Sequence, residues 1–245
     1  YLPSLDYDLQ RHGPDSPQAA AALAETLTQI EPLVAAAEAQ GREWLVTGDY
    51  AIESVTAPDG AVFPNRILHA AGLFHTRETA RLLYPDFFTS RAFAVVDHQI
   101  AHLHVPDHAD LQQVRELFAA EPGIGEILDQ EAQSECGIHF PERSGDLLLI
   151  AAPGRWFAYP WWTDPRQAPD YARQMDIHNK PGFDPVELFF GFPPPHTSQK
   201  TEKIRGTHGR SGPGHEIAAA GLFPEAASFA GLAAALRDRL NPPER

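Results

Sequence analysis

A short stretch near the start of the chain carries side chains with the chemistry to bind a metal ion. From Leu5 to Pro14 the sequence reads Leu-Asp-Tyr-Asp-Leu-Gln-Arg-His-Gly-Pro, which gathers two carboxylates, an amide and an imidazole before a Gly-Pro turn. Carboxylates are ionised at neutral pH, so they are ready ligands for a divalent cation. The alternative is an acidic surface loop without a bound ion.

Two later motifs favour the metal site. Residues 45–50 read Leu-Val-Thr-Gly-Asp-Tyr, an apolar run that delivers Asp49 at its end, and residues 205–209 read Arg-Gly-Thr-His-Gly, with His208 in a glycine-rich turn. Glycine allows the backbone to approach a bound ion closely. The alternatives are that Asp49 only forms a turn after a strand, and that His208 lies in a surface turn.

In their order along the chain, the three motifs resemble the metal ligands of the alkaline phosphatase superfamily, most closely its type I phosphodiesterase/nucleotide pyrophosphatase branch. That pattern is Asp-x-x-x-His before Gly-Pro, then Asp-His after a strand, then His in a Gly-x-His-Gly turn. Three of its five positions keep the ligand type in this chain, and two histidines are replaced. Aligned on the Gly-Pro turn, the five positions are Asp6, Gln10, Asp49, Tyr50 and His208.

The resemblance implies two bound divalent metal ions, with zinc expected and manganese or magnesium as alternatives. Asp6 and His208 would hold one ion, with Gln10 as a further candidate ligand, and Asp49 would hold the second, with Tyr50 as a candidate. Amide and phenol oxygens are weak ligands for zinc and suit harder cations better. These two replacements therefore put the identity and number of the ions in question.

Other polar residues are alternative ligands. His12 follows Asp8 by four residues and forms a second Asp-x-x-x-His, although this places the histidine directly against the Gly-Pro turn, out of step with the family pattern. Asp176, His178 and Asp184 form the densest polar motif of the second half, and they would replace the ligands lost at the two substituted positions. An ordered loop with a paired lysine is the alternative for that motif.

The resemblance further implies a hydrolase that cleaves phosphodiester or related phosphate or phosphonate ester bonds in a small-molecule substrate. The Ser or Thr nucleophile is expected upstream of residue 1, so residues 1–245 alone should be inactive. The competing hypothesis is a non-catalytic relative that binds a small molecule or a protein partner. Gln10 and Tyr50 favour that alternative, because they weaken the predicted ligand set.

Composition limits the other classes of function. With 33 acidic and 19 basic residues the formal net charge is -14, which disfavours a protein that binds nucleic-acid polymers through their phosphates. Cys136 is the single cysteine and forms no intrachain disulfide. No apolar run approaches the roughly 20 residues of a membrane span. We expect a soluble protein without a membrane partner; the compartment stays open, with the cytoplasm slightly favoured, and the oligomeric state is not predicted.

The elements around these motifs predict one α/β domain over residues 1–245. Buried strand-like runs near Leu45, Ala92 and Leu147 are separated by helical segments, which is typical of a mainly parallel sheet covered by helices, as in alkaline phosphatase. Residues 92–105 should add a local antiparallel hairpin. We interpret its three histidines as polar positions of a half-exposed strand rather than as a metal site; they are His98, His102 and His104.

Capping and periodicity place the helices. Ser16-Pro17 is a cap signal that opens an alanine-rich helix to about Gln40, with Pro32 expected to kink or divide it. Apolar spacing predicts helices at 110–120 and near the C-terminus, and a short helix at Ile127-Leu128. Trp161 and Trp162 are interpreted either as a substrate-groove wall or as core residues, of which the core is the commoner.

Overall fold

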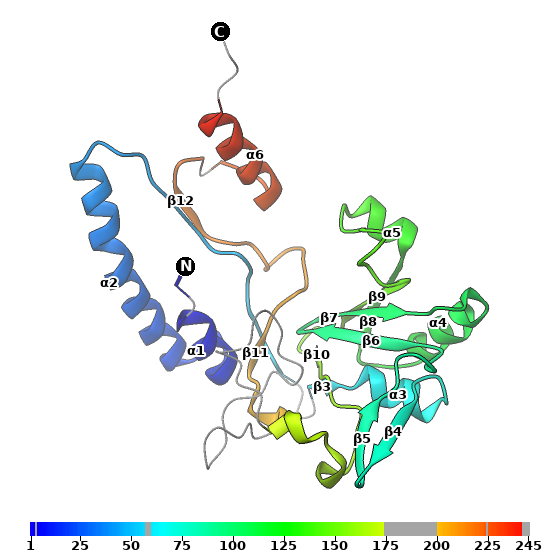
Figure 1. The fold of residues 1–245 in the computed structure, drawn as a ribbon. Helices are drawn as coiled ribbons and strands as arrows, with labels where there is room; N and C mark the ends of the chain where they lie inside the picture. The colour runs from blue at the N-terminus through cyan, green and yellow to red at the C-terminus, as the bar shows by residue number, and fades with distance from the viewer. Residues whose placement is uncertain (3, 57–59, 174–199, 224, 242–245) are drawn as a thin grey trace.

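The computed structural model describes residues 1–2, 4–56, 60–173, 200–223 and 225–241 (Figure 1). The α-helices in these ranges are α1 Ser4–His12, α2 Pro17–Ala39, α3 Pro64–Ala70, α4 Leu111–Ala119, α5 Gln130–Glu135 and α6 Phe229–Leu240. The 3-10 helices are η1 His108–Asp110, η2 Pro165–Gln167, η3 Asp170–Arg173 and η4 Thr201–Lys203. The strands are β1 Leu45–Thr47, β2 Glu53–Ser54, β3 Ala61–Val62, β4 Thr76–Thr79, β5 Leu82–Pro85, β6 Phe93–Asp97, β7 Ile100–His104, β8 Ile124–Asp129, β9 Leu147–Ala151, β10 Trp156–Phe157, β11 Gly206–Thr207 and β12 Ala219–Gly221.

The largest sheet in the described residues has four strands in the order β6-β7-β9-β8. Every neighbouring pair in it is antiparallel. Along β6 and β7 alternate residues are buried, as the two-residue repeat of a strand requires when one face packs on the core. Helices α3 and α4 pack against its edge strands β6 and β8 (Figure 1).

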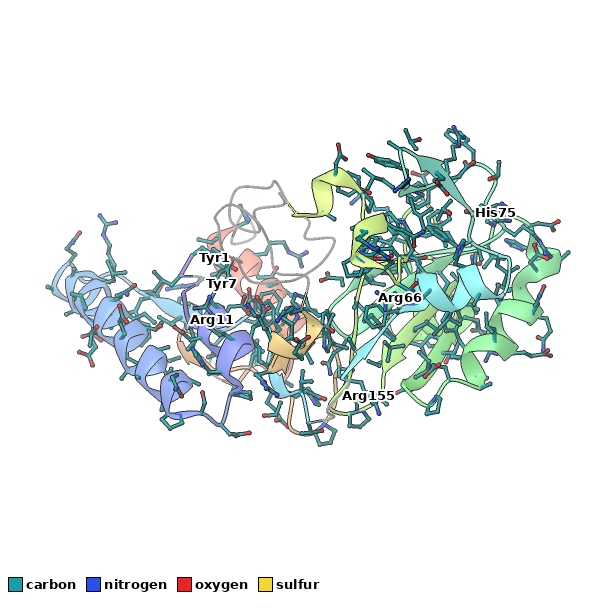
Figure 2. All side chains as sticks on the ribbon, turned by 90° about the horizontal axis from the view of Figure 1, so that it is seen from below. Tyr1, Tyr7, Arg11, Arg66, His75 and Arg155 are labelled. Atoms are coloured by element: carbon teal, nitrogen blue, oxygen red, sulfur yellow. The ribbon has the colours of Figure 1, made fainter. Side chains whose placement is uncertain are left out.

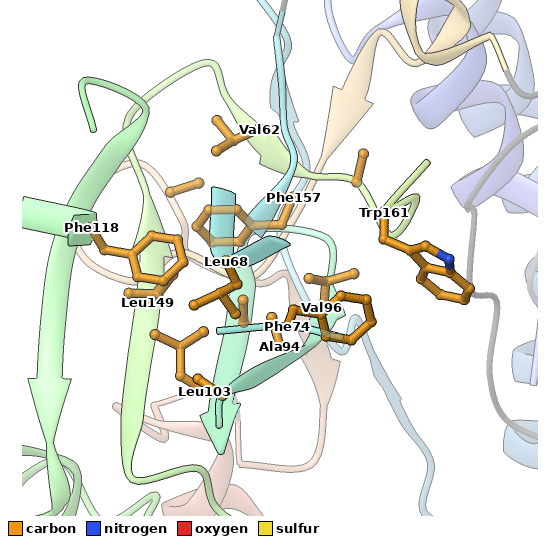
Figure 3. Packing of buried hydrophobic residues seen from close by; sticks show 14 of the residues in the cluster. Val62, Leu68, Phe74, Ala94, Val96, Leu103, Phe118, Leu149, Phe157 and Trp161 are labelled. Carbon is orange, nitrogen blue, oxygen red and sulfur yellow. The ribbon is translucent and has the colours of Figure 1, made fainter. Parts of the chain in front are cut away.

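The core lies between this sheet and its helices. Leu68 of α3 and Phe118 of α4 are fully buried and belong to the same cluster as Leu103 and Leu149 of the sheet (Figure 3). Trp161 joins this cluster beside Phe74, with ring centroids 5.9 Å apart, and its indole N–H donates to the Leu83 carbonyl at 2.9 Å. Trp161 is only 2 % exposed and Trp162 only 3 %, so they are core residues and not the wall of an open groove.

Two sequence-based expectations are wrong. The chain is mixed α/β, but a mainly parallel sheet is not found in the described residues, where only β3 with β10 is parallel. Strands β6 and β7 are joined by a turn of two residues, which permits only an antiparallel return. The expected helix at Ile127-Leu128 is strand β8, because Ile127 lies opposite Leu149 and Leu128 opposite Leu148 in β9. Periodicity alone does not tell whether a short apolar run is a helix or a strand, and here pairing with a buried strand makes it a strand.

Other expectations are confirmed. The hairpin predicted at 92–105 is β6 and β7, and the strand predicted from Leu147 is β9. Helix α2 begins at Pro17 with Ser16 as its N-cap, whose hydroxyl accepts from the Ala19 amide at 3.1 Å. Pro32 lies inside α2 without dividing it. The strand expected near Leu45 is β1, but it is half-buried and pairs antiparallel with β12.

One edge of the large sheet is covered by a side chain. Asn65, at the start of α3 and 2 % exposed, donates to the Ala94 carbonyl at 2.9 Å and accepts from the Ala94 amide at 2.8 Å. Because β6 is an edge strand, these bonds take the place of a neighbouring strand at Ala94. No helix in the described part of the chain has the length and apolar character needed to cross a membrane.

Candidate active site

Helix α1 and strand β11 meet directly, and this contact determines where Asp6 lies. The Arg205 amide donates to the Gln10 carbonyl at 2.7 Å. At Gly206 a Cβ atom would collide with the Leu9 carbonyl oxygen of α1 and lie 2.8 Å from the Ile52 side chain. Glycine is therefore required at this position, and it brings the helix that carries Asp6 against the strand that leads to His208.

The Asp6 carboxylate is held by two donors from different segments. Gln10, one helical turn later, donates to Oδ2 at 2.9 Å, and the Tyr50 hydroxyl also hydrogen-bonds to Asp6. Burial, together with the nearby charge of Asp49, raises the pKa of Asp6 above its usual range, while the two hydrogen bonds oppose this rise. The other oxygen, Oδ1, is buried and has no hydrogen-bond partner. A buried carboxylate oxygen without a partner costs free energy, so this atom is available to a ligand.

Tyr50 and two histidines form a continuous stack of rings. The Tyr50 and His208 ring centroids are 3.8 Å apart with planes at 15°, and His98 lies on His208 at 3.7 Å with planes at 35°. Burial and the neighbouring His98 lower the pKa of His208 to about 3, although the charges of Asp97 and Asp49 act in the opposite direction. His208 is therefore neutral at pH 7, the form of imidazole that offers a lone pair to a metal.

The Tyr50 hydroxyl stays protonated. Burial, followed by the charges of Asp6 and Asp49, raises the pKa of Tyr50 far above its ordinary value. A neutral phenol that donates to a carboxylate is a weaker ligand than a phenolate. In this arrangement Tyr50 and Gln10 support Asp6, and their roles as metal ligands stay predictions.

The arrangement fits a divalent cation at three of the five predicted positions. Asp6 offers the unpartnered Oδ1, His208 offers a neutral imidazole, and Asp49 is an exposed carboxylate whose charge acts on both. Among the residues that the structure describes, no three His, Cys, Asp or Glu side chains are close enough together to hold a metal ion. The fold thus brings the predicted ligands into one neighbourhood without assembling a coordination sphere.

The alternative ligand His12 pairs with Asp8. His12 faces Asp8 across one turn of α1 at 3.8 Å, with both side chains partly exposed, whereas Asp6 is the residue that interacts with Tyr50. This geometry favours the alignment that pairs Asp6 with Gln10. The alternative ligands of the second half lie outside the described residues; they are Asp176, His178 and Asp184.

The three hairpin histidines do not act as a group. His102 accepts from the Gly145 amide at 3.1 Å, and His104 stacks on Phe93 with ring centroids 5.0 Å apart. Burial is the main cause that lowers the pKa of both His102 and His104. His98 is separate, because it occupies the turn with φ of +51° and joins the ring stack. Sequence reasoning missed its place beside His208, and the signal available was its position in a tight turn after a buried strand.

The neighbourhood lies at the junction between the N-terminal helices and the large sheet. Figure 2 shows Tyr7 and Arg11 of α1 on one side and His75 on the other, with Arg155 between them. Gln99, the residue after His98, donates its backbone amide to the His208 carbonyl at 2.8 Å and its side-chain amide to the Arg155 carbonyl at 3.2 Å. The site is therefore connected to both parts of the structure.

A family model described as type I phosphodiesterase / nucleotide pyrophosphatase matches residues 1–184, more than half of the chain. The chain belongs to this family. Membership agrees with the family pattern on which the sequence motifs were aligned, and the matched region includes four of the five predicted ligand positions, all except His208. No curated protein matches the chain.

Some solved structures share a distant likeness with the chain. A phosphonoacetate hydrolase from Sinorhizobium meliloti 1021 in complex with phosphonoformate is 17% identical with a TM-score of 0.45, and the match covers 66% of this chain and 38% of that one. Murine ectonucleotide pyrophosphatase / phosphodiesterase 5 is 14% identical with a TM-score of 0.45, with 62% and 36% covered. The human protein of that name is 13% identical over the same shares, also with a TM-score of 0.45. The chain thus spans well under half the length of each of these structures.

Proposed function

We propose that the protein is a metal-dependent hydrolase of phosphodiester or related phosphate or phosphonate ester bonds in small molecules. Family membership supports the reaction class. The observation that carries the proposal for this chain is the meeting of Asp6 and His208 across Tyr50, because these residues are far apart in sequence and come from the first helix and from the turn after β11.

Asp6, Asp49 and His208 are the proposed ligands. Gln10 and Tyr50 hold the Asp6 carboxylate by hydrogen bonds, and Oδ1 remains buried without a hydrogen-bond partner. Bound divalent cations, two in the proposal and zinc first among them, would screen the charge that develops on a transferring phosphoryl group. The Gln10 amide oxygen and the Tyr50 phenol oxygen are the remaining candidate donors to the cations.

The nucleophile is proposed to come from outside residues 1–245. Thr207 is adjacent to His208, but it is fully buried and its hydroxyl oxygen has no hydrogen-bond partner, so no substrate reaches it. Thr47 is exposed, but its hydroxyl donates to the Gly48 carbonyl at 2.8 Å, and it lies on β1 rather than among the rings of the site. Activated hydroxyl nucleophiles require a base or a metal within hydrogen-bond reach.

Turnover tests this proposal. The full-length protein should hydrolyse a chromogenic phosphodiester when zinc, manganese or magnesium is added, whereas residues 1–245 alone should not. Asp49→Ala and His208→Ala should abolish the activity, and a matched change at an exposed acid remote from the site, Glu116→Gln, should leave it unchanged. Full activity of the two alanine variants, or of the wild type in chelator, would contradict the mechanism.

A second candidate is a non-catalytic relative that binds a small molecule or a protein partner. It is favoured by the two hydrogen bonds that Gln10 and Tyr50 donate to Asp6, because they satisfy part of the charge that a cation would otherwise balance. Metal content of the full-length protein separates the two candidates. The hydrolase should purify with, or take up, about two ions per chain, and the binding protein should take up none.

A further inference from the structure

Glu53 is the centre of a polar cluster that the proposed chemistry does not use. We call Glu53, Gln99, Arg210 and His215 the Glu53 cluster. Glu53 lies in β2, and its side chain is 19% exposed, as is that of Arg210, while that of His215 is 13% exposed. A carboxylate this enclosed is retained only when it is well paired.

The Glu53 carboxylate is fully engaged. Its Oε1 accepts from the Gly154 amide at 2.6 Å, and its Oε2 lies 2.7 Å from His215 Nε2 and 3.3 Å from Arg210 Nε. The Arg210 contact is an ion pair rather than a hydrogen bond, since Nε has no hydrogen-bond partner. Burial acts to raise the pKa of Glu53, but the bonds from Gly154, His215 and Gln99 and the charge of Arg210 prevail and lower it.

These contacts lie on both sides of His208 in the sequence. The backbone of Glu53 pairs with Thr207 in the β2–β11 ladder, immediately before His208. Its side chain then binds Arg210 and His215, which follow His208. Gly209, between His208 and Arg210, has φ of +122° and packs against Gln99. A Cβ atom at Gly209 would lie 3.2 Å from the Gln99 Cβ. The turn that carries His208 is thus fixed at its two ends by one residue.

Gln99 joins the same turn to the large sheet. Its side-chain oxygen accepts from the Arg210 amide at 3.3 Å, and its backbone amide donates to the His208 carbonyl at 2.8 Å. Its own carbonyl accepts from the Ala151 amide at 2.9 Å, and Arg210 Nη1 donates to the Ala151 carbonyl at 2.7 Å. Through these bonds the Glu53 cluster determines how the His208 turn lies on the hairpin that carries His98.

We propose that Glu53 is a positioning residue for the candidate active site: by binding Arg210, His215 and Gln99 it holds the His208 ring between Tyr50 and His98. Only the consequence for catalysis rests on the proposed function. Glu53 binds residues that follow His208, so its effect is exerted through the backbone of the turn. The ring stack, rather than the stability of the fold, is what its charge controls.

The test follows the rings directly in residues 1–245. Proton NMR with selectively labelled His, Tyr, Ala and Leu measures the nuclear Overhauser effects between His208 and Tyr50, between His208 and His98, and between Ala94 and Leu103 of the hairpin. Glu53→Gln keeps an oxygen for the Gly154 amide but places an amide group where Oε2 met Arg210 and His215. We expect the ring contacts of His208 to be lost while the Ala94 to Leu103 contacts of the hairpin persist.

Two further variants keep the result decisive. Arg210→Gln removes the cation that pairs with Glu53 and should cause the same loss of ring contacts. Glu43→Gln, which breaks the exposed ion pair with Arg239, should change neither set of contacts. Unchanged ring contacts in Glu53→Gln and Arg210→Gln would overturn the proposal. Loss of the ring and hairpin contacts together in both variants would also overturn it, because it would assign the cluster to global stability.

Activity of the full-length protein gives an independent readout. If the wild type turns over a phosphodiester, Glu53→Gln should lower kcat with little change in KM, because the substrate contacts remain while His208 is displaced. A wild type without turnover would contradict the proposed function alone, since the ring contacts are measured without substrate or metal.

Discussion

Tyr50 and His208 lie face to face, with ring centroids 3.8 Å apart and planes inclined by 15°. The two residues are separated by most of the chain, and their contact closes the gap between the segment after β1 and the turn after β11. Burial favours the neutral form of both rings, because it lowers the pKa of His208 and raises that of Tyr50.

Lowering the pH should destabilise the protein through His208. Its pKa of about 3 in the folded state lies below the ordinary value of 6.5, so the unfolded chain binds more protons between these values. The contribution of His208 to the free energy of unfolding is therefore fully present above about pH 6.5. It is lost as the pH falls toward 3, by at most about 1.4 kcal/mol per pH unit. Urea unfolding of wild type and His208→Gln from pH 7.5 to 4.5 measures this. The variant should lose less stability than the wild type, and equal losses in the two would contradict it; His108→Gln, at an exposed histidine, is the control.

Removing the Tyr50 hydroxyl should destabilise the fold. Tyr50→Phe takes away one donor from Asp6, whose Oδ1 already has no partner, so a partly buried carboxylate loses part of its compensation. We expect a loss of about 1–3 kcal/mol in the free energy of unfolding, measured with urea. The matched control is Tyr84→Phe, which breaks an exposed bond to Asp170 of 3.0 Å and should cost much less. Equal losses in the two variants would show that the Tyr50 bond to Asp6 contributes no more to stability than the exposed bond of Tyr84.

Adding a methyl group at Gly206 should separate α1 from β11. Gly206→Ala forces a Cβ atom against the Leu9 carbonyl oxygen, which is backbone and has no rotamer to give way. Overpacking of this kind costs roughly 1–3 kcal/mol, which denaturant unfolding would detect. Gly48→Ala is the comparison, because its Cβ would meet the Ile217 Cβ at an ordinary 3.8 Å. A tolerated Gly206→Ala would mean that the helix does not depend on this close approach.

Divalent cations should stabilise the wild type through Asp6, Asp49 and His208. Zinc or manganese at a hundredfold excess over its dissociation constant should add about 2.7 kcal/mol to the stability of the folded state, seen as a rise in Tm. Asp49→Ala and His208→Ala should each reduce this rise, and dialysis against chelator should reverse it. A Tm that does not respond to any of the cations would favour the non-catalytic candidate.

How far the sequence predicts this structure differs between elements. Local signals were sufficient for α2, where Ser16 and Pro17 specify a helix start, and for the β6–β7 hairpin, whose strands are joined by a turn of two residues. Strand β8 could not be predicted, since Ile127 and Leu128 become a strand only by pairing with β9. The pairing of a strand depends on residues far away in the sequence, so it cannot be predicted from the residues of that strand alone.

The same distinction holds for the site. The motifs at Asp6 and His208 were recognisable because each lies beside glycines or a turn with a definite chemistry, and the structure brings both to Tyr50. The place of His98 was not predictable, because it depends on Gln99 binding the His208 backbone across the molecule. The predicted ligand roles of Gln10 and Tyr50 await the metal measurements described above.

The Asn65 amide bound to both backbone groups of Ala94 has a consequence for how this protein behaves at high concentration. A free edge strand invites the same strand of another molecule to add to the sheet, which is a route to insoluble fibres. At Ala94 of β6 the backbone groups that such a neighbour would bind are already occupied by α3 of the same chain. A single amide side chain thereby limits self-association at this edge, and its loss would expose the sheet to growth by stacking of copies.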